Sequence, residues 1–163
     1  MKRLCTKEYL FFLLLFWLTA CSAVGMRFQS AAPPNAESSL VYIYRPSSWK
    51  NMLISPGVLI DGEEKFLMQN SAYSFFYLNP GLHTFTLKLS DRYEGLAQVQ
   101  LNTQANRTYF VKVETNFGPG MFGRSFKIAS VPDDIGQEEI QECGYLDPAQ
   151  SRKFSKSYIQ EEN

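Results

Sequence analysis

The sequence predicts a mostly β protein, an antiparallel β-sandwich of about seven to eight strands with one short C-terminal helix. Short apolar runs recur between residues 40 and 131, and several of them alternate apolar with polar residues as a half-buried strand does. Turn residues, chiefly Gly, Pro, Asn and Asp, separate these runs. A single segment, residues 133–143, favours a helix.

The first element along the chain is a secretory signal, residues 1–20. Three cations precede an almost unbroken apolar run over residues 9–18, and that run is shorter than the roughly 20 residues that a transmembrane anchor needs. The signal ends in Leu18-Thr19-Ala20-Cys21, which resembles the lipobox of bacterial lipoproteins. This resemblance implies that Cys21 receives acyl chains such as palmitate and becomes the N-terminus of the mature protein.

An acylated Cys21 would anchor the chain stably, because two or more acyl chains hold a protein at a bilayer where one is marginal. Ser22 stands where an Asp would resemble an inner-membrane retention signal, so we expect the outer membrane, with the domain facing the periplasm. Residues 21–39 are small and polar and include two prolines, which predicts a flexible tether.

Removal of the signal leaves 143 of the 163 residues, enough for one domain, which we expect at residues 40–146. The formal charge changes from 0 to −2, which gives no reason to expect nucleic-acid binding. Cys5 leaves with the signal and Cys21 carries lipid, so Cys143 has no intrachain partner. It is either a buried small apolar residue or the site of an intermolecular disulfide.

The first predicted strand carries apolar residues on both of its faces, as expected for a strand in the middle of a sheet. Pro46 ends it. The next two runs flank Asp61-Gly62, a strong signal for a tight hairpin. A turn at residues 79–81 and a turn at residues 106–108 separate later strands. The predicted strands are residues 40–45, 58–60, 65–68, 73–78, 83–89, 97–101, 109–114 and 126–131.

The helix at residues 133–143 has Asp133 or Asp134 to cap its start and Gly144 to end it. The polar residues that follow, 147–163, are expected to be a loose tail.

Four segments, residues 41–48, 58–62, 78–84 and 106–113, resemble a family of small bacterial lipoproteins. Its common domain is one of unknown function and is similar to PEGA-type β-sandwich modules. The most specific parts of the match are the Tyr-Arg-Pro run that ends at Pro46 and the Pro-Gly-x-His-x-Phe run that ends at Phe85. The resemblance implies a β-sandwich in the cell envelope, and it carries over no catalytic residue.

Residues 118–123 satisfy the spacing G-x-G-x-x-G, but a dinucleotide site needs a helix after the glycines, whereas a strand is predicted here. We interpret the segment as a hairpin loop whose apolar tip, Met121 and Phe122, could touch a partner or the membrane. Trp49, in the loop after the first strand, is the other candidate binding residue, because an exposed ring can stack on a sugar or peptide.

His83 is the only histidine, and it shares the inward parity of Phe85, which favours a structural role with satisfied hydrogen bonds. One histidine and one free cysteine make a poor zinc set, and no G-x-S-x-G nucleophile elbow occurs. We therefore expect no catalytic residue, no metal and no cofactor.

The sequence thus predicts a non-enzymatic envelope lipoprotein that acts as an interaction or structural module. Its expected partners are the lipid bilayer, through Cys21, and an envelope protein or cell-wall component. The alternative is a module that binds cell-wall glycan or peptide through Trp49 and the loop at residues 117–123. A third hypothesis, an unrecognised hydrolase, would have to use His83.

Overall fold

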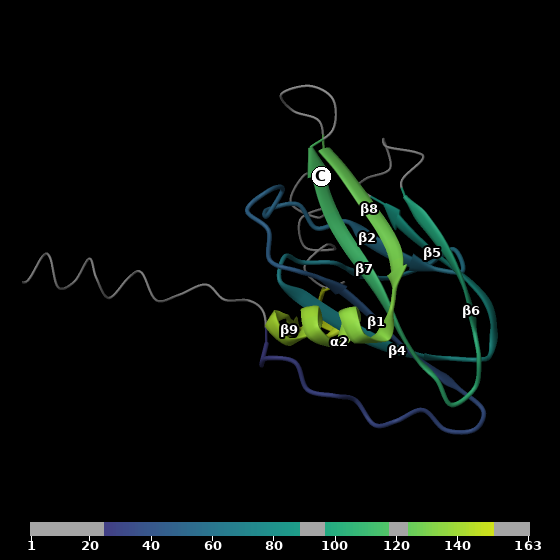
Figure 1. Cartoon of the computed structure of the whole chain (residues 1–163). Helices are drawn as coiled ribbons and strands as arrows, with labels where there is room; N and C mark the ends of the chain where they lie inside the picture. The colour runs from purple at the N-terminus through teal and green to yellow at the C-terminus, as the bar shows by residue number, and fades with distance from the viewer. Residues whose placement is uncertain (1–24, 89–96, 118–123, 152–163) are drawn as a thin grey trace, which may run out of the picture.

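The computed structural model describes residues 25–88, 97–117 and 124–151. Over these residues two β-sheets face each other, one of five strands and one of four (Figure 1). The five-stranded sheet has the order β8 (Arg124–Val131), β7 (Thr108–Phe117), β1 (Ser39–Arg45), β4 (Ala72–Leu78) and β9 (Gly144–Tyr145). The four-stranded sheet has the order β3 (Glu63–Leu67), β2 (Gly57–Ile60), β5 (Gly81–Lys88) and β6 (Gln98–Thr103).

The predicted β-sandwich is confirmed, and each predicted run forms a strand. The expectation of purely antiparallel sheets is wrong, because β1 pairs with β7 in parallel and β4 pairs with β9 in parallel. Strand β1 lies in the middle of its sheet, and β7 joins it only after the chain has passed through the four-stranded sheet. The alternation of apolar and polar residues predicts where strands lie, but it does not tell which strands pair or in which direction.

The core between the sheets comes from the alternating positions of both layers. Aliphatic side chains dominate on the five-stranded side, and Phe66 and Phe85 add rings from the four-stranded side. The fully buried members from β1, β2, β5 and β7 are Val41, Ile43, Val58, Phe85, Leu87, Val111 and Val113.

The hairpin predicted at Asp61-Gly62 is confirmed. Both residues have positive φ, 51° for Asp61 and 83° for Gly62, as a two-residue loop of the I′ kind requires. Gly81, in the turn that carries the chain from one sheet to the other, has a φ of 146°, which a residue with a side chain rarely adopts.

The outer face of the five-stranded sheet is covered by helix α2 (Asp133–Glu139) and by the 3₁₀ turn η2 (Ile140–Glu142). A Cβ added at Gly136 would lie 2.2 Å from the Phe110 Cγ, so the helix backbone rests directly on β7. The predicted helix is confirmed, but its predicted caps are wrong. Pro132 holds the N-cap position without a side-chain cap, and Gly144 begins β9 instead of ending the helix.

The predicted flexible tether is wrong for residues 25–38, which run along the same outer face. Phe28 packs edge-on against the rings of Tyr42 and Tyr73, with centroids 5.5 and 5.1 Å away. Arg27 also forms a β-bridge with Gly144. The Phe28 ring and the Arg27 bridge therefore help to fix a segment whose composition is otherwise that of a linker.

The prediction of a loose tail from residue 147 is wrong for residues 147–151, of which 148–151 are helical. Ser151 is buried, and its Oγ accepts a hydrogen bond from the Leu67 N–H at 2.6 Å and donates one to the Leu67 carbonyl at 3.2 Å. Residues 152–163 lie outside the described residues, as does the signal at residues 1–20. Among the helices that the structure describes, none has the length and apolar character to cross a bilayer.

Candidate functional site

The loop at residues 46–56, which follows β1, is held closed by the side chain of Arg45. This guanidinium is buried, and it donates from Nη1 to the Ile54 carbonyl at 2.7 Å and from Nη2 to the Asn51 carbonyl at 2.9 Å. It also lies 5.3 Å from the centre of the Phe126 ring. Burial lowers the pKa of Arg45 to about 10, which still leaves it charged at neutral pH. We call residues 46–56 the clamped loop.

The clamped loop turns backbone carbonyls inward and apolar side chains outward. Trp49, Met52 and Leu53 are all exposed, which confirms the predicted exposure of Trp49. Hydrogen bonds fix the start of the loop, since the Ser48 N–H donates to Asn70 Oδ1 at 3.1 Å and the Lys50 N–H donates to Ser48 Oγ at 3.2 Å. The loop therefore presents its side chains from a fixed backbone.

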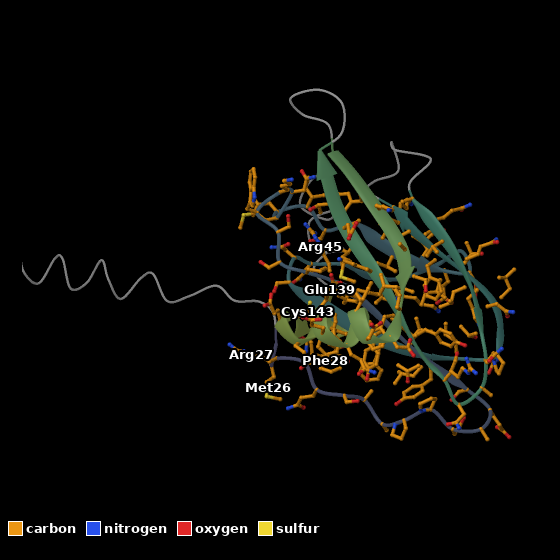
Figure 2. The ribbon with its side chains drawn as sticks, viewed as in Figure 1. Met26, Arg27, Phe28, Arg45, Glu139 and Cys143 are labelled. Carbon is orange, nitrogen blue, oxygen red and sulfur yellow. The ribbon has the colours of Figure 1, made fainter. Side chains whose placement is uncertain are left out.

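A polar cleft of about 320 Å³ lies beside the clamped loop, at the end of β1. Its walls come from the Arg-Pro-Ser-Ser run, from β7 and from the end of α2, and Figure 2 labels two of its lining residues, Arg45 and Glu139. The lining residues are Arg45, Pro46, Ser47, Ser48, Lys112, Val113, Glu114, Thr115 and Glu139.

Lys112 is the centre of the charge network in the cleft. Its Nζ lies 2.7 Å from Glu139 Oε1 and 2.9 Å from Glu114 Oε1, and the Tyr44 hydroxyl donates to Glu139 Oε2 at 2.6 Å. Burial disfavours the charge of Lys112, but these carboxylates hold its pKa above the ordinary value. Burial likewise opposes the charge of Glu139, whose pKa the bonds from Lys112 and Tyr44 hold below its ordinary value.

These shifts keep Lys112 protonated and Glu139 ionised around neutral pH, so neither is poised to exchange a proton with a substrate. The two cations and two carboxylates of the lining balance in formal charge. The arrangement suits the binding of an uncharged polar group through hydrogen bonds better than it suits catalysis.

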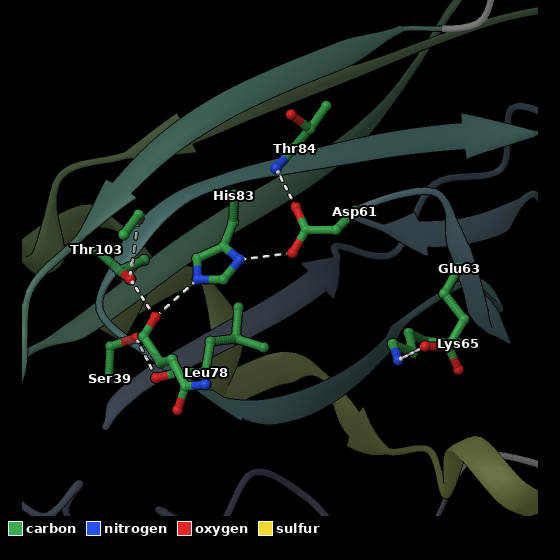
Figure 3. A network of polar contacts seen from close by, with 10 residues as sticks. Ser39, Asp61, Glu63, Lys65, Leu78, His83, Thr84 and Thr103 are labelled. Carbon is green, nitrogen blue, oxygen red and sulfur yellow. Dashed lines mark hydrogen bonds and ion pairs between the residues drawn. The ribbon is translucent and has the colours of Figure 1, made fainter. Parts of the chain in front are cut away.

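His83 lies away from this cleft, where it joins two turns (Figure 3). Its Nδ1 is 2.6 Å from Asp61 Oδ2 and its Nε2 is 2.7 Å from the Asn79 carbonyl. Partial burial opposes its charge, yet the bonds to Asn79 and Asp61 hold the pKa of His83 above its ordinary value. Both ring nitrogens are engaged, so neither remains to activate a nucleophile, and the structural role expected for His83 fits this geometry.

Cys143 is buried on the outer face of the sheet, where its Sγ donates to the Arg45 carbonyl at 3.6 Å. Burial raises the pKa of this thiol to about 12. Of the two alternatives for Cys143, the structure shows the buried one.

A second hollow, an apolar groove of about 390 Å³, lies between the start of the described chain and the β9 edge of the sheet. Aromatic rings from β4 and β9 form one wall, and residues 26–31 form the other.

The remaining predicted site residues, Cys21, Met121 and Phe122, lie outside the described residues. Within the described ranges, no group of three or more His, Cys, Asp or Glu side chains could hold a metal ion. Sequence reasoning missed the pairing of Lys112 with Glu139. The outward parity of Lys112 and the acidic end of the helix were visible signals, but which sheet face the helix covers was not.

Comparisons with known proteins give one match, to a protein family. No similar protein was found among curated proteins or among solved structures. The family described as "Protein of unknown function (DUF2846)" matches residues 35–124, more than half of the chain. The match contains β1 to β7 and the clamped loop, and it ends before α2 and Glu139. The resemblance to a domain of unknown function is thereby confirmed, and the chain belongs to the DUF2846 family.

Proposed function

We propose that the protein is a lipid-anchored envelope lipoprotein whose β-sandwich serves as a non-enzymatic interaction or structural module. The clamped loop and its polar cleft carry this proposal, because they form a preorganised surface of exposed side chains and paired charges. Such a surface is suited to contact with another molecule.

The anchor part of the proposal is supported by the order of cations, apolar run and Leu-Thr-Ala-Cys at the N-terminus. Ser22 supports the outer membrane, facing the periplasm, as the location.

The anchor is tested by mass spectrometry of the protein expressed with its own N-terminus. The expected mature chain begins at an acylated Cys21, whereas Cys21→Ala retains Met1 and incorporates no labelled fatty acid. An unmodified Cys21 in the wild type, or an intact Met1, would contradict the proposal.

The interaction role is tested by placing a photo-crosslinking residue at Ser47, an exposed residue of the cleft, in living cells. A matched control carries the same residue at Leu82, which is exposed at the opposite end of the sandwich. The proposal expects a reproducible cross-linked product from position 47 that position 82 does not give. The same products from both positions would count against a specific surface.

Binding of cell-wall glycan or peptide is the second candidate, favoured by the exposure of Trp49 beside a cleft of balanced charge. It predicts retention of the protein on purified sacculi and loss of that retention in Trp49→Ala but not in Leu82→Ala. Failure of the wild type to bind sacculi removes this candidate.

A further inference from the structure

The three most exposed large apolar side chains of the described residues lie in two segments, whereas the fourth, Leu82, lies at the other end of the sandwich. Leu53 is 91% exposed, Trp49 75% and Met26 73%, and Met52 on the same loop as Trp49 is 53% exposed. Trp49, Met52 and Leu53 stand on one short loop, and such a group of exposed apolar side chains marks a contact surface. What covers it depends on where the two segments lie.

The two segments lie at the same end of the sandwich, where β1 ends and β4 begins. The turn at residues 70–71 joins them: Asn70 accepts a hydrogen bond from the Ser48 N–H, and the Ser71 carbonyl accepts one from the Gly144 N–H at 3.0 Å. Gly144 in turn pairs with Arg27. In Figure 1 the purple start of the described chain and the blue loop after β1 lie on the same side of the domain.

The hydrogen bonds of Arg45 keep the apolar side chains of the clamped loop on its outer side. The loop cannot turn its side chains inward while the Arg45 guanidinium holds the carbonyls of Asn51 and Ile54. Asn51 also has a positive φ, 51°, which directs the chain at the tip. The buried arginine therefore fixes the backbone from which Trp49, Met52 and Leu53 project.

The short length of chain between Cys21 and Gly25 indicates which surface faces this end of the sandwich. Cys21 precedes Gly25 by four residues, and four fully extended residues span at most about 14 Å. If Cys21 is acylated, the start of the described chain must stay that close to the lipid surface. The end of the sandwich that carries Met26 is then the end nearest the bilayer.

We propose that this end rests on the bilayer that holds Cys21, with Met26, Trp49, Met52 and Leu53 entering its interface. This inference rests on the proposed lipid anchor. Tryptophan favours the boundary between headgroups and acyl chains, and shallow apolar insertion adds to the hold of a lipid anchor. Arg27 and Lys50 adjoin these side chains in the sequence, but with four exposed apolar side chains at this end we take apolar contact, and not net charge, as the main attraction.

The chain offers its own probe, because its two tryptophans are Trp17, in the signal, and Trp49. The acylated full-length protein is reconstituted into vesicles of phosphatidylethanolamine and phosphatidylglycerol, and Trp49 emission is measured. We expect a blue-shifted emission, strong quenching by lipids brominated on the acyl chains and weak quenching by aqueous iodide. The same result is expected in purely zwitterionic vesicles.

A matched control moves the fluorophore to the far end of the sandwich by combining Trp49→Phe with Leu82→Trp. There we expect the reverse, strong iodide quenching and weak quenching by brominated lipid. A second variant, Leu53→Asp, should reduce the brominated-lipid quenching of Trp49, whereas Leu82→Asp should leave it unchanged.

Three outcomes would overturn the inference. If the protein floats with the vesicles but iodide and not brominated lipid quenches Trp49, the anchor stands and the bilayer contact fails. If the protein does not float and Cys21 is unmodified, the anchor fails and the inference fails with it. If peptidoglycan fragments shift the emission of vesicle-bound protein while brominated lipid does not quench it, Trp49 serves the cell wall instead.

Discussion

The two faces of the five-stranded sheet are covered in different ways. The inner face meets a second sheet and presents aliphatic side chains, such as Val41, Ile43 and Val111. The outer face meets a short helix and an irregular segment, and it presents mostly aromatic side chains. These are Tyr42, Tyr44, Tyr73 and Phe110, with Leu40 among them.

Hydroxyl groups explain the difference. A sheet that covers another sheet has already paired its own backbone, whereas an irregular segment brings unpaired N–H and C=O groups that need partners. Tyr42 accepts a hydrogen bond from the Ala31 N–H at 2.8 Å, and Tyr73 accepts one from the Gln29 N–H at 3.1 Å. Tyrosine thus supplies both apolar area and a polar group where the covering chain is not regular.

The largest expected effect is on the inner face. Phe85→Ala empties a fully buried position between the sheets and should lower the free energy of unfolding by about 3–5 kcal/mol. Phe28→Ala, on the half-buried outer cover, should cost roughly 2 kcal/mol or less. Urea denaturation of both variants measures this. Equal losses would contradict the larger contribution that we assign to the inner face.

The next effect comes from the contact between α2 and β7. Gly136→Ala places a Cβ against the Phe110 ring and should cost about 1–3 kcal/mol, because the helix must shift outward. Cys143, buried beneath this cover, should then react faster with a thiol reagent. Ile135→Ala, on the exposed side of the same helix, is the control and should leave the labelling rate unchanged.

A smaller effect is expected from single hydroxyl groups. Tyr42→Phe keeps the ring but removes the acceptor for the Ala31 N–H, which should cost about 1 kcal/mol. Hydrogen exchange at Ala31 should accelerate while exchange in β5 stays slow. Tyr109→Phe, whose hydroxyl accepts from the Gln104 N–H, is the matched control and should not affect Ala31.

The smallest effect is the response to acid. The folded-state pKa of Glu139 lies below its value of 4.5 in the unfolded chain, so its stabilising bonds to Lys112 and Tyr44 are fully present above pH 4.5. They are lost as the pH falls through the lower, folded-state value. The protection of α2 amides against hydrogen exchange should therefore fall in acid more than that of β4 amides. Glu139→Gln should flatten this difference, and an unchanged profile would contradict the assigned role.

The same comparison separates what the sequence predicts from what it does not. The alternation of apolar and polar residues around Phe85 and Val111 predicts which side chains face the inner core, because a strand with one buried face has this pattern. The outer cover leaves no such pattern in the sequence. Residues 25–38 have the composition of a linker, and they are held by the Phe28 ring and by hydrogen bonds to tyrosines far along the chain. The role of Arg45 is hidden in a similar way, since the Tyr-Arg-Pro run is visible in the sequence but does not reveal the hydrogen bond from Arg45 to the Ile54 carbonyl.

The bridge between Arg27 and Gly144 joins residues 117 positions apart. A chain that is made from its N-terminus onward cannot complete this edge until its last strand is present, and such distant pairings form slowly. During that interval the outer aromatic face and the thiol of Cys143 are without their final cover. The segment nearest Cys21 is thus among the last to be fixed in place. It can pair with Gly144 only after the rest of the domain has been made.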